Sequence, residues 1–152
     1  MKPVVKLCKA EDIINVRHKV LRPDRDISSC FFVGDSDLKT LHFCAHVNDD
    51  IIGCVSYYKN NHALFNRKFG SNQYQLRGMA ILDKYQGKGV GNELIKYSED
   101  YLKMNAYQFI WCNARVNSTG FYRKFNFEPI GKSFTIQDVG RHFLMFKNLV
   151  ND

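Results

Sequence analysis

The chain has 152 residues, of which 45% are hydrophobic and 24% are charged. These values are typical of a globular protein, favour a single domain over residues 1–152, and exclude a mainly disordered chain. No stretch reaches the roughly 20 apolar residues of a membrane helix, and the N-terminal residues carry no apolar signal core. We therefore expect a cytoplasmic protein with no membrane partner.

The formal net charge of +7 favours a partner that carries phosphate. Nucleic acid is one such partner and a phosphate-rich cofactor is another. The basic residues are spread along the chain without a run of five, so we expect no nucleic-acid partner. The five cysteines show no C-x-x-C spacing, which indicates reduced thiols.

The first half of the chain predicts a strand, a helix and a hairpin. Residues 4–8 favour a short strand, and residues 11–20 favour a helix that Pro23 ends. Residues 24–40 are ambiguous, a loop with a short helix. The pattern then predicts a hairpin with strands at residues 41–47 and 51–58, followed by a polar loop at 59–72.

The second half contains the clearest helix, residues 90–104, whose apolar residues recur with a period near 3.6. A strand precedes it, and a strand, a short helix and two closing strands follow. The order indicates a mixed α/β (α+β) fold. The strands before and after this helix are predicted at residues 74–82 and 107–114. The short helix is predicted at 118–125, and the closing strands at 127–130 and 142–147.

A glycine-rich loop, Gln86–Gly91, lies between a predicted strand and the clearest helix. Backbone N–H groups in such a loop can approach an anion, and the helix N-terminus adds partial positive charge. The ATP-binding P-loop pattern fails because Gly89, not Ser or Thr, follows Lys88. The dinucleotide pattern fails on glycine spacing and on the missing acidic residue.

What remains is Q-x-x-G-x-G, which resembles the pyrophosphate loop of the GNAT acetyltransferases. The segment 76–81 resembles that family's splayed central strand, and residues 114–127 resemble its second cofactor segment. The resemblance implies a mostly antiparallel sheet of six to seven strands, flanked by about four helices and splayed at its central strands. Dimers are common in the family, so a homodimer is an alternative to a monomer.

Two positions depart from the family pattern. Gly120 stands where Ala is common, which loosens a short helix. Asn126 stands where Gly is usual; because Asn tolerates the left-handed conformation, we expect this change to be mild.

The resemblance also implies acetyl-CoA as co-substrate and no metal. Backbone groups of Met79, Ala80 and Ile81 would polarise the thioester carbonyl and align the pantetheine arm. The remaining cofactor-binding residues implied are Gln86, Gly87, Lys88, Gly89, Val90, Gly91, Asn92 and Asn117.

Two residues are candidates for proton transfer. Tyr122 matches the family's general acid beside the thioester sulfur; the alternative is an ordinary core aromatic. The family does not define the base. The closing segment 138–147 resembles a pattern of one bacterial GNAT branch, which makes His142 a candidate base; the alternative is a strand-edge histidine without a role.

Three arginines, Arg17, Arg22 and Arg77, are candidate substrate-binding residues. Strand alternation predicts that Arg77 shares a face with Met79 and Ile81. Arginines near the acceptor pocket would favour a carboxylate or phosphate on the substrate, whereas solvated surface arginines are the alternative.

Taken together, the sequence predicts an N-acetyltransferase that passes an acetyl group from acetyl-CoA to a primary amine by direct attack in a ternary complex. The acceptor is a small-molecule or protein amine. The alternative is a non-catalytic acyl-CoA-binding sensor or regulator. We expect no metal at His42, Cys44 and His46, because same-face neighbours on a strand are about 6.6 Å apart.

Overall fold

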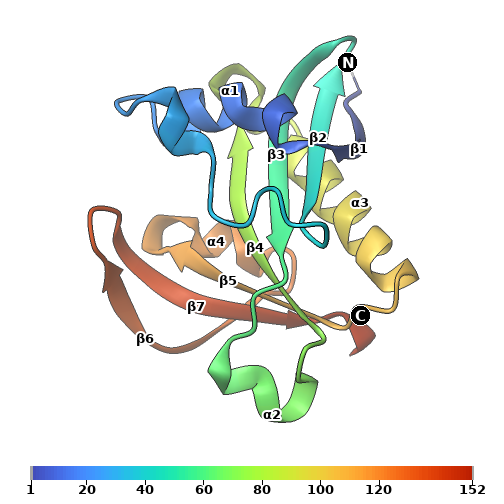
Figure 1. Ribbon diagram of the computed structural model, residues 1–152, viewed down its shortest axis with the longest axis vertical. Helices are drawn as coiled ribbons and strands as arrows, with labels where there is room; N and C mark the ends of the chain where they lie inside the picture. The colour runs from blue at the N-terminus through green and yellow to red at the C-terminus, as the bar shows by residue number, and fades with distance from the viewer. Residues whose placement is uncertain (1, 152) are drawn as a thin grey trace.

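A computed structural model describes residues 2–151 (Figure 1). Seven strands form one sheet in the order β1-β2-β3-β4-β5-β7-β6, and every neighbouring pair is antiparallel except β4 with β5. The strands are β1 Val4–Cys8, β2 Leu41–Val47, β3 Asp50–Tyr58, β4 Gln73–Ile81, β5 Phe109–Arg115, β6 Glu128–Ile136 and β7 Gly140–Asn148. The predicted sheet type is thereby confirmed.

Within residues 2–151, four α-helices flank this sheet, as the resemblance implied. They are α1 Ala10–Leu21, α2 Asn66–Phe69, α3 Val90–Met104 and α4 Thr119–Arg123. Short 3-10 turns, η1 to η5, lie at Ile27–Cys30, Ala63–Phe65, Asp83–Tyr85, Val116–Ser118 and Leu149–Asn151. Within residues 2–151, no helix is long and apolar enough to cross a membrane.

The helices divide between the two faces of the sheet (Figure 1). Helix α1 packs on β2, β3 and β4, whereas α3 packs on the opposite face of β1 to β3 and α4 lies against β5 and β6. The main hydrophobic core lies on the α3 side. It includes the fully buried Leu94, Ile95 and Leu102 of α3. Burial of one such side chain contributes roughly 1.5–3 kcal/mol.

Strands β4 and β5 separate after only three paired residues. The parallel pairing joins Gln73 to Phe109, Tyr74 to Ile110 and Gln75 to Trp111, and then stops. In Figure 1, β2 to β4 run along the vertical while β5, β7 and β6 cross the lower half. The edge of β4 that faces β5 therefore has no strand partner beyond Gln75, which opens the sheet at its centre.

A bulge in β4 changes which side chains share a face. Ser56 pairs with Arg77 and Cys54 with Ala80, so two residues of β4, Gly78 and Met79, oppose one residue of β3. Gly78 has φ of +68°, a conformation that costs other residues energy. The prediction that Arg77 shares a face with Met79 and Ile81 was wrong. Arg77 lies on the α1 face, whereas the other two pack against the α3-side core.

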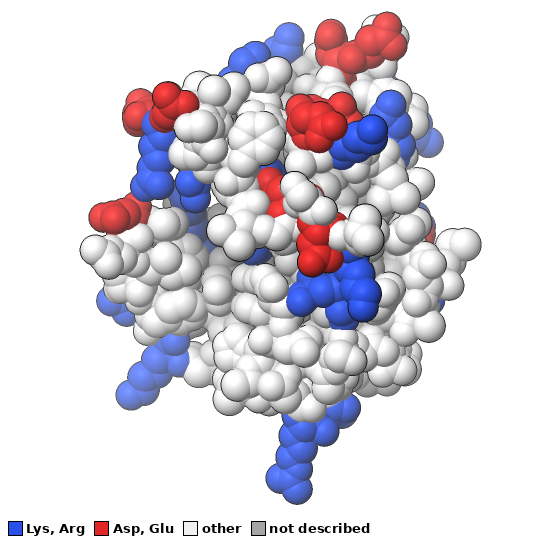
Figure 2. Space-filling model, in the orientation of Figure 1, with Lys and Arg blue, Asp and Glu red and all other residues white. Residues whose placement is uncertain are grey.

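Two further segments differ from the sequence expectation. The stretch 59–72, expected as loop, contains η2 and α2, which hold Phe65 and Phe69 against Phe109 of β5. Strand β6 extends to Ile136, well past the expected end at residue 130, because after a register shift between Ile130 and Phe134 it pairs again with β7, as far as Gly140. Figure 2 shows basic and acidic side chains interspersed on this view of the surface.

Candidate functional site

The glycine-rich loop meets the N-terminus of α3 with its backbone uncovered. Gly87 and Gly89 have φ of +74° and +85°, and a Cβ built on either would meet no atom within 4 Å. Among residues 2–151, the amides of Gly87, Lys88 and Gly89 donate to no protein atom. The first N–H groups of α3 also lack acceptors within the helix. These donors lie at the positive end of a 15-residue helix, an arrangement that favours the binding of an anion.

The side chains of Gln86 and Val90 fix the position of this loop, and its backbone donors stay uncovered. Nε2 of Gln86 donates to the carbonyl of Ile81 at 2.9 Å, which ties the loop to the end of β4. Val90 is buried in the main core, whereas Lys88 and Asn92 are exposed. Asn117 is exposed at the turn before α4. The loop thus presents backbone donors on a scaffold fixed by Gln86 and Val90.

The first turn of α3 lies in close contact with α4. A Cβ built on Gly91 would lie 2.8 Å from Cε1 of Phe121, closer than real side chains approach. Glycine is therefore required sterically at this position. Because Phe121 precedes Tyr122, this contact fixes the loop and the candidate acid relative to each other.

Tyr122 lies where β4 and β5 separate. The residue is 8% exposed, and its ring packs against Phe121 and Phe127. Burial raises the pKa of Tyr122 well above its usual value, with smaller contributions from nearby Cys112 and Tyr57. Cys112 follows the last paired residue of β5, and Tyr57 lies opposite Leu76, which follows the last paired residue of β4. Because its pKa is raised, the phenol of Tyr122 is protonated at neutral pH.

The hydroxyl group of Tyr122 has no hydrogen-bond partner within the described residues, and it is not sealed from the exterior. A buried phenol normally finds a partner. An unpartnered O–H at the opening between two strands is available to a ligand.

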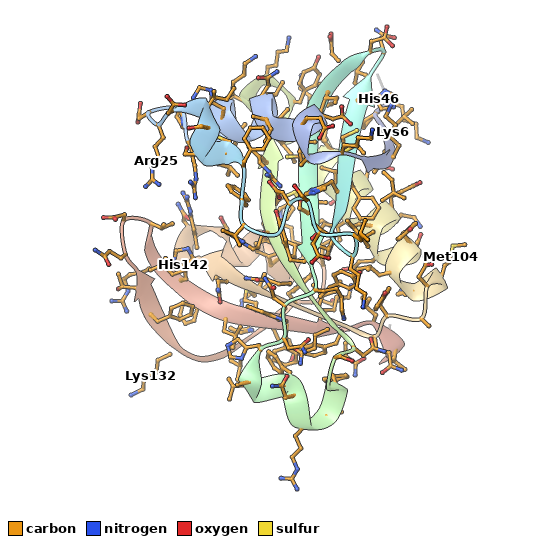
Figure 3. All side chains as sticks on the ribbon, in the orientation of Figure 1. Lys6, Arg25, His46, Met104, Lys132 and His142 are labelled. Atoms are coloured by element: carbon orange, nitrogen blue, oxygen red, sulfur yellow. The ribbon has the colours of Figure 1, made fainter. Side chains whose placement is uncertain are left out.

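His142 lies on β7, opposite Arg115 of β5 and Phe134 of β6. Its ring is 4% exposed, and Nδ1 donates to the carbonyl of Gly140 at 2.8 Å. A carbonyl can only accept, so neutral His142 carries its lone pair on Nε2, which has no protein partner within residues 2–151. Figure 3 shows His142 on the β6–β7 hairpin, below the segment from which Arg25 extends.

Arg17 is fully buried and forms the centre of a polar cluster. Its Nη1 and Nη2 donate to Asp35 at 2.7 and 3.2 Å, and Nη1 also donates to the carbonyl of Cys30. Nη2 donates further to Ser56 and Tyr58, both at 3.0 Å. All terminal donors of Arg17 are thus directed to the protein, and this placement assigns it a structural part in the cluster.

Asp35 receives the remaining donors of the cluster. Tyr58 donates its O–H at 2.5 Å, and the amide of Phe32 donates at 2.8 Å. Burial alone would raise the pKa of Asp35, but the hydrogen bonds from Arg17, Tyr58 and Phe32 outweigh it, so the pKa is lowered. His42 completes the cluster through Ser56 and the carbonyl of Asp35.

The other two predicted arginines lie beside this cluster. The guanidinium groups of Arg22 and Arg77 lie 5.0 and 5.2 Å from the ring centre of Phe32. Arg77 also lies 5.2 Å from the ring of Tyr58. The structure therefore brings Arg22 and Arg77 together on the α1 face. Sequence reasoning missed Phe32, Asp35 and Tyr58, which carry no motif.

Residues 10–127 match the sequence model of the acetyltransferase (GNAT) family. The match spans more than half of the chain and includes the glycine-rich loop, the splayed strand and Tyr122. The chain therefore belongs to the GNAT acetyltransferase family.

Two kinds of relatives agree with this assignment. The chain is 32% identical over 145 residues to YitI, an uncharacterized N-acetyltransferase of Bacillus subtilis (strain 168), which covers 95% of both sequences. The fold of the present chain is similar to that of an aminoglycoside 6'-N-acetyltransferase complexed with coenzyme A (TM-score 0.76, 10% identity, 96% and 97% of the two chains). It is equally similar to Escherichia coli ElaA (TM-score 0.76, 12% identity, 96% and 99%).

Proposed function

We propose that this protein transfers the acetyl group of acetyl-CoA to a primary amine, by direct attack of the amine in a ternary complex. The observation that carries the proposal is the separation of β4 and β5 after Gln75 and Trp111. This opening lies next to the loop amides of residues 87–89 and the Tyr122 hydroxyl group, none of which has a hydrogen-bond partner within residues 2–151.

The residues present fit the cofactor. The amides of Gly87, Lys88 and Gly89 and the first turn of α3 would hold the pyrophosphate, because no side chain blocks their approach. The unpaired edge of β4 at Met79–Ile81 would hydrogen-bond the amide groups of the pantetheine arm as an added strand would. Asn117, in the turn before the short helix α4, would be a further contact with the cofactor. When bound, acetyl-CoA supplies an activated acyl group.

Three groups of the chain would then act on the reaction. A backbone N–H of Met79, Ala80 or Ile81 polarises the thioester carbonyl, where negative charge develops as the amine attacks. Nε2 of His142 accepts a proton from the amine, and the hydrogen bond from Nδ1 to Gly140 holds it in the required tautomer. Tyr122, kept protonated by burial, donates its proton to the departing thiolate.

We place this activity in the cytoplasm. The cysteines Cys8, Cys30, Cys44, Cys54 and Cys112 are all free thiols in the structure. Free thiols are typical of a reducing compartment.

The test is the release of CoA thiol from acetyl-CoA over a panel of primary amines, with mass spectrometry of the acetylated product. We expect turnover, and we expect Tyr122→Phe to lower kcat by about 10²-fold or more while the KM for acetyl-CoA changes little. Unchanged kcat in Tyr122→Phe would reject the acid role. Acetyl-CoA binding without turnover of any amine would instead support a non-catalytic acyl-CoA sensor.

A further inference from the structure

Four arginines surround the opening of the sheet on its α1 face. Arg22 lies at the end of α1, Arg25 in the segment that follows, Arg77 on β4 and Arg115 at the end of β5. Partial burial lowers the pKa of Arg22, and the positive charges of Arg25, Arg77 and Arg115 lower it further. Arg25, Arg77 and Arg115 therefore each lie close enough to Arg22 to act on its charge, although the four residues come from separate segments.

No carboxylate neutralises this group, which we call the arginine cluster (Arg22, Arg25, Arg77 and Arg115). Within residues 2–151, none of its members forms an ion pair, and no carboxylate is among the groups that shift the pKa of Arg22. Arg22 donates to the carbonyl of Ser29, and Arg25 donates to the carbonyl of Asp138 in the β6–β7 turn. In Figure 2, basic and acidic side chains both lie at the left of this face, where the segment after α1 approaches the β6–β7 hairpin.

Arg77 is held in place without being neutralised. It lies over the rings of Phe32 and Tyr58, each at 5.2 Å. Arg17 and Asp35 fix both rings, because Arg17 stacks on Phe32 at 4.2 Å and Asp35 accepts from the amide of Phe32 and the hydroxyl of Tyr58. The aromatic faces attract the guanidinium, and its five N–H donors are left for a ligand.

The arginine cluster borders the region where the amine must enter. Arg115 lies opposite His142, and both Arg115 and Met79 lie four residues beyond the last paired residues of β5 and β4. The loop that would hold the pyrophosphate belongs to α3, on the other face of the sheet. The phosphates of the cofactor are therefore not the anions that the arginine cluster would bind.

We propose that the acceptor is a primary amine that also carries an oxyanion group, a carboxylate or a phosphate, and that Arg22, Arg77 and Arg115 bind this group while the amine faces His142. This inference rests on the proposed acetyl transfer. Arginine forks match both oxyanions in geometry and charge. A polyamine would be repelled by the same positive charges.

The experiment compares matched acceptors in the thiol-release assay. γ-Aminobutyrate is paired with butylamine, phosphoethanolamine with ethanolamine, and spermidine represents polycationic amines. We expect the acidic member of at least one pair to exceed its neutral partner and spermidine by about tenfold or more in kcat/KM. The pair that responds distinguishes a carboxylate from a phosphate acceptor.

Variants then assign the effect to the arginine cluster. Arg77→Gln is expected to raise the KM for the acidic amine about tenfold or more, with the KM for acetyl-CoA unchanged. Arg77→Lys keeps the charge but loses the fork, so it should restore only part of the affinity. Arg67→Gln removes an exposed arginine of α2, remote from the opening, and serves as the matched control.

The outcomes separate the two proposals. Failure of acetyl-CoA to bind in calorimetry would remove the proposed function itself. Turnover that favours neutral or polycationic amines, or equal effects of Arg77→Gln and Arg67→Gln, would overturn the acidic acceptor while acetyl transfer stands. Acetyl-CoA binding with no binding or turnover of any acidic amine would also overturn it.

Discussion

Two regions of the molecule, the buried cluster around Arg17 and the surroundings of the separated strands β4 and β5, use their polar groups in opposite ways. In the buried cluster around Arg17, both terminal nitrogens of the guanidinium are paired with Asp35, Ser56, Tyr58 or a backbone carbonyl. A few residues away, Arg77 and Arg115 have no carboxylate partner within residues 2–151, and Tyr122 has a free hydroxyl group. The first region pairs its polar groups within the protein, apart from Nε of Arg17, which is buried without a hydrogen-bond partner among the described residues.

The difference indicates which polar groups are available to ligands. Groups that the protein leaves unpaired beside an opening are available to a ligand; Tyr122 is buried among them, whereas residues 87–89 and Arg115 are exposed. The amides of Gly87 to Gly89, the edge of β4, Tyr122 and the arginine cluster all belong to this second kind. They converge on the point where β4 leaves β5.

Breaking the buried Arg17–Asp35 pair should have the largest effect on stability. Asp35→Asn leaves the fully buried Arg17 without a counter-charge. We expect the free energy of unfolding to fall by about 3–5 kcal/mol, measured by urea denaturation. A loss below about 1 kcal/mol would mean that the Arg17–Asp35 pair does not hold this region.

A second substitution tests the link between the loop and Tyr122. Gly91→Val places a side chain where Phe121 already lies, at 2.8 Å from the new Cβ. We expect a loss of about 1–3 kcal/mol in unfolding free energy and weaker acetyl-CoA binding, because α3 and α4 must move apart. Gly120→Ala, at a position with no atom within 4 Å, is the control and should not destabilise the protein.

The loss of stability at alkaline pH should compare buried thiols in the two regions. Burial raises the pKa of Cys54, beside the Arg17 cluster, and of Cys112, beside Tyr122, each to about 12. The contribution of each protonated thiol to the free energy of unfolding is complete below the thiol pKa of the unfolded chain, about 8.5. Because the folded-state pKa is raised, this contribution is lost as the pH rises toward 12. Each thiol should contribute a slope of about 1.4 kcal/mol per pH unit.

The measurement is the unfolding free energy between pH 8 and 11 for the wild type, Cys54→Ala and Cys112→Ala. Each variant should show a shallower decline than the wild type. Parallel curves for all three proteins would show that these thiols ionise freely in the folded state.

The smallest expected effect on stability belongs to the unpaired region. Arg77→Gln removes no ion pair, so we expect the unfolding free energy to change by about 0.5 kcal/mol or less in denaturant titration. A loss comparable to that of Asp35→Asn would place Arg77 in the structural cluster and contradict the comparison.

Local patterns predicted most of the fold. The helix Val90–Met104 was predicted with both ends, because its period and its preceding glycines are sequence-local signals. The left-handed tolerance of Asn126 was also confirmed, since its φ is +67°. The family resemblance supplied the separation of the central strands, which no periodicity contains.

The candidate site was less predictable, because its geometry depends on distant contacts. Strand alternation placed Arg77 with Met79, and only the bulge at Gly78 reverses this. Asp35 lies in the stretch 24–40, whose sequence has no period, and it becomes visible only when it meets Arg17 and Tyr58. The roles of Tyr122 and His142 remain predictions.

The most direct test is a titration of the isotopically labelled protein with acetyl-CoA, followed by backbone amide resonances in NMR. The account predicts saturable shifts at Gly87, Lys88 and Gly89 and along Met79–Ile81, with the side-chain Nε–H of Arg17 unchanged. Absence of binding, or shifts confined to the Arg17 cluster, would contradict the assignment of the unpaired donors to the cofactor.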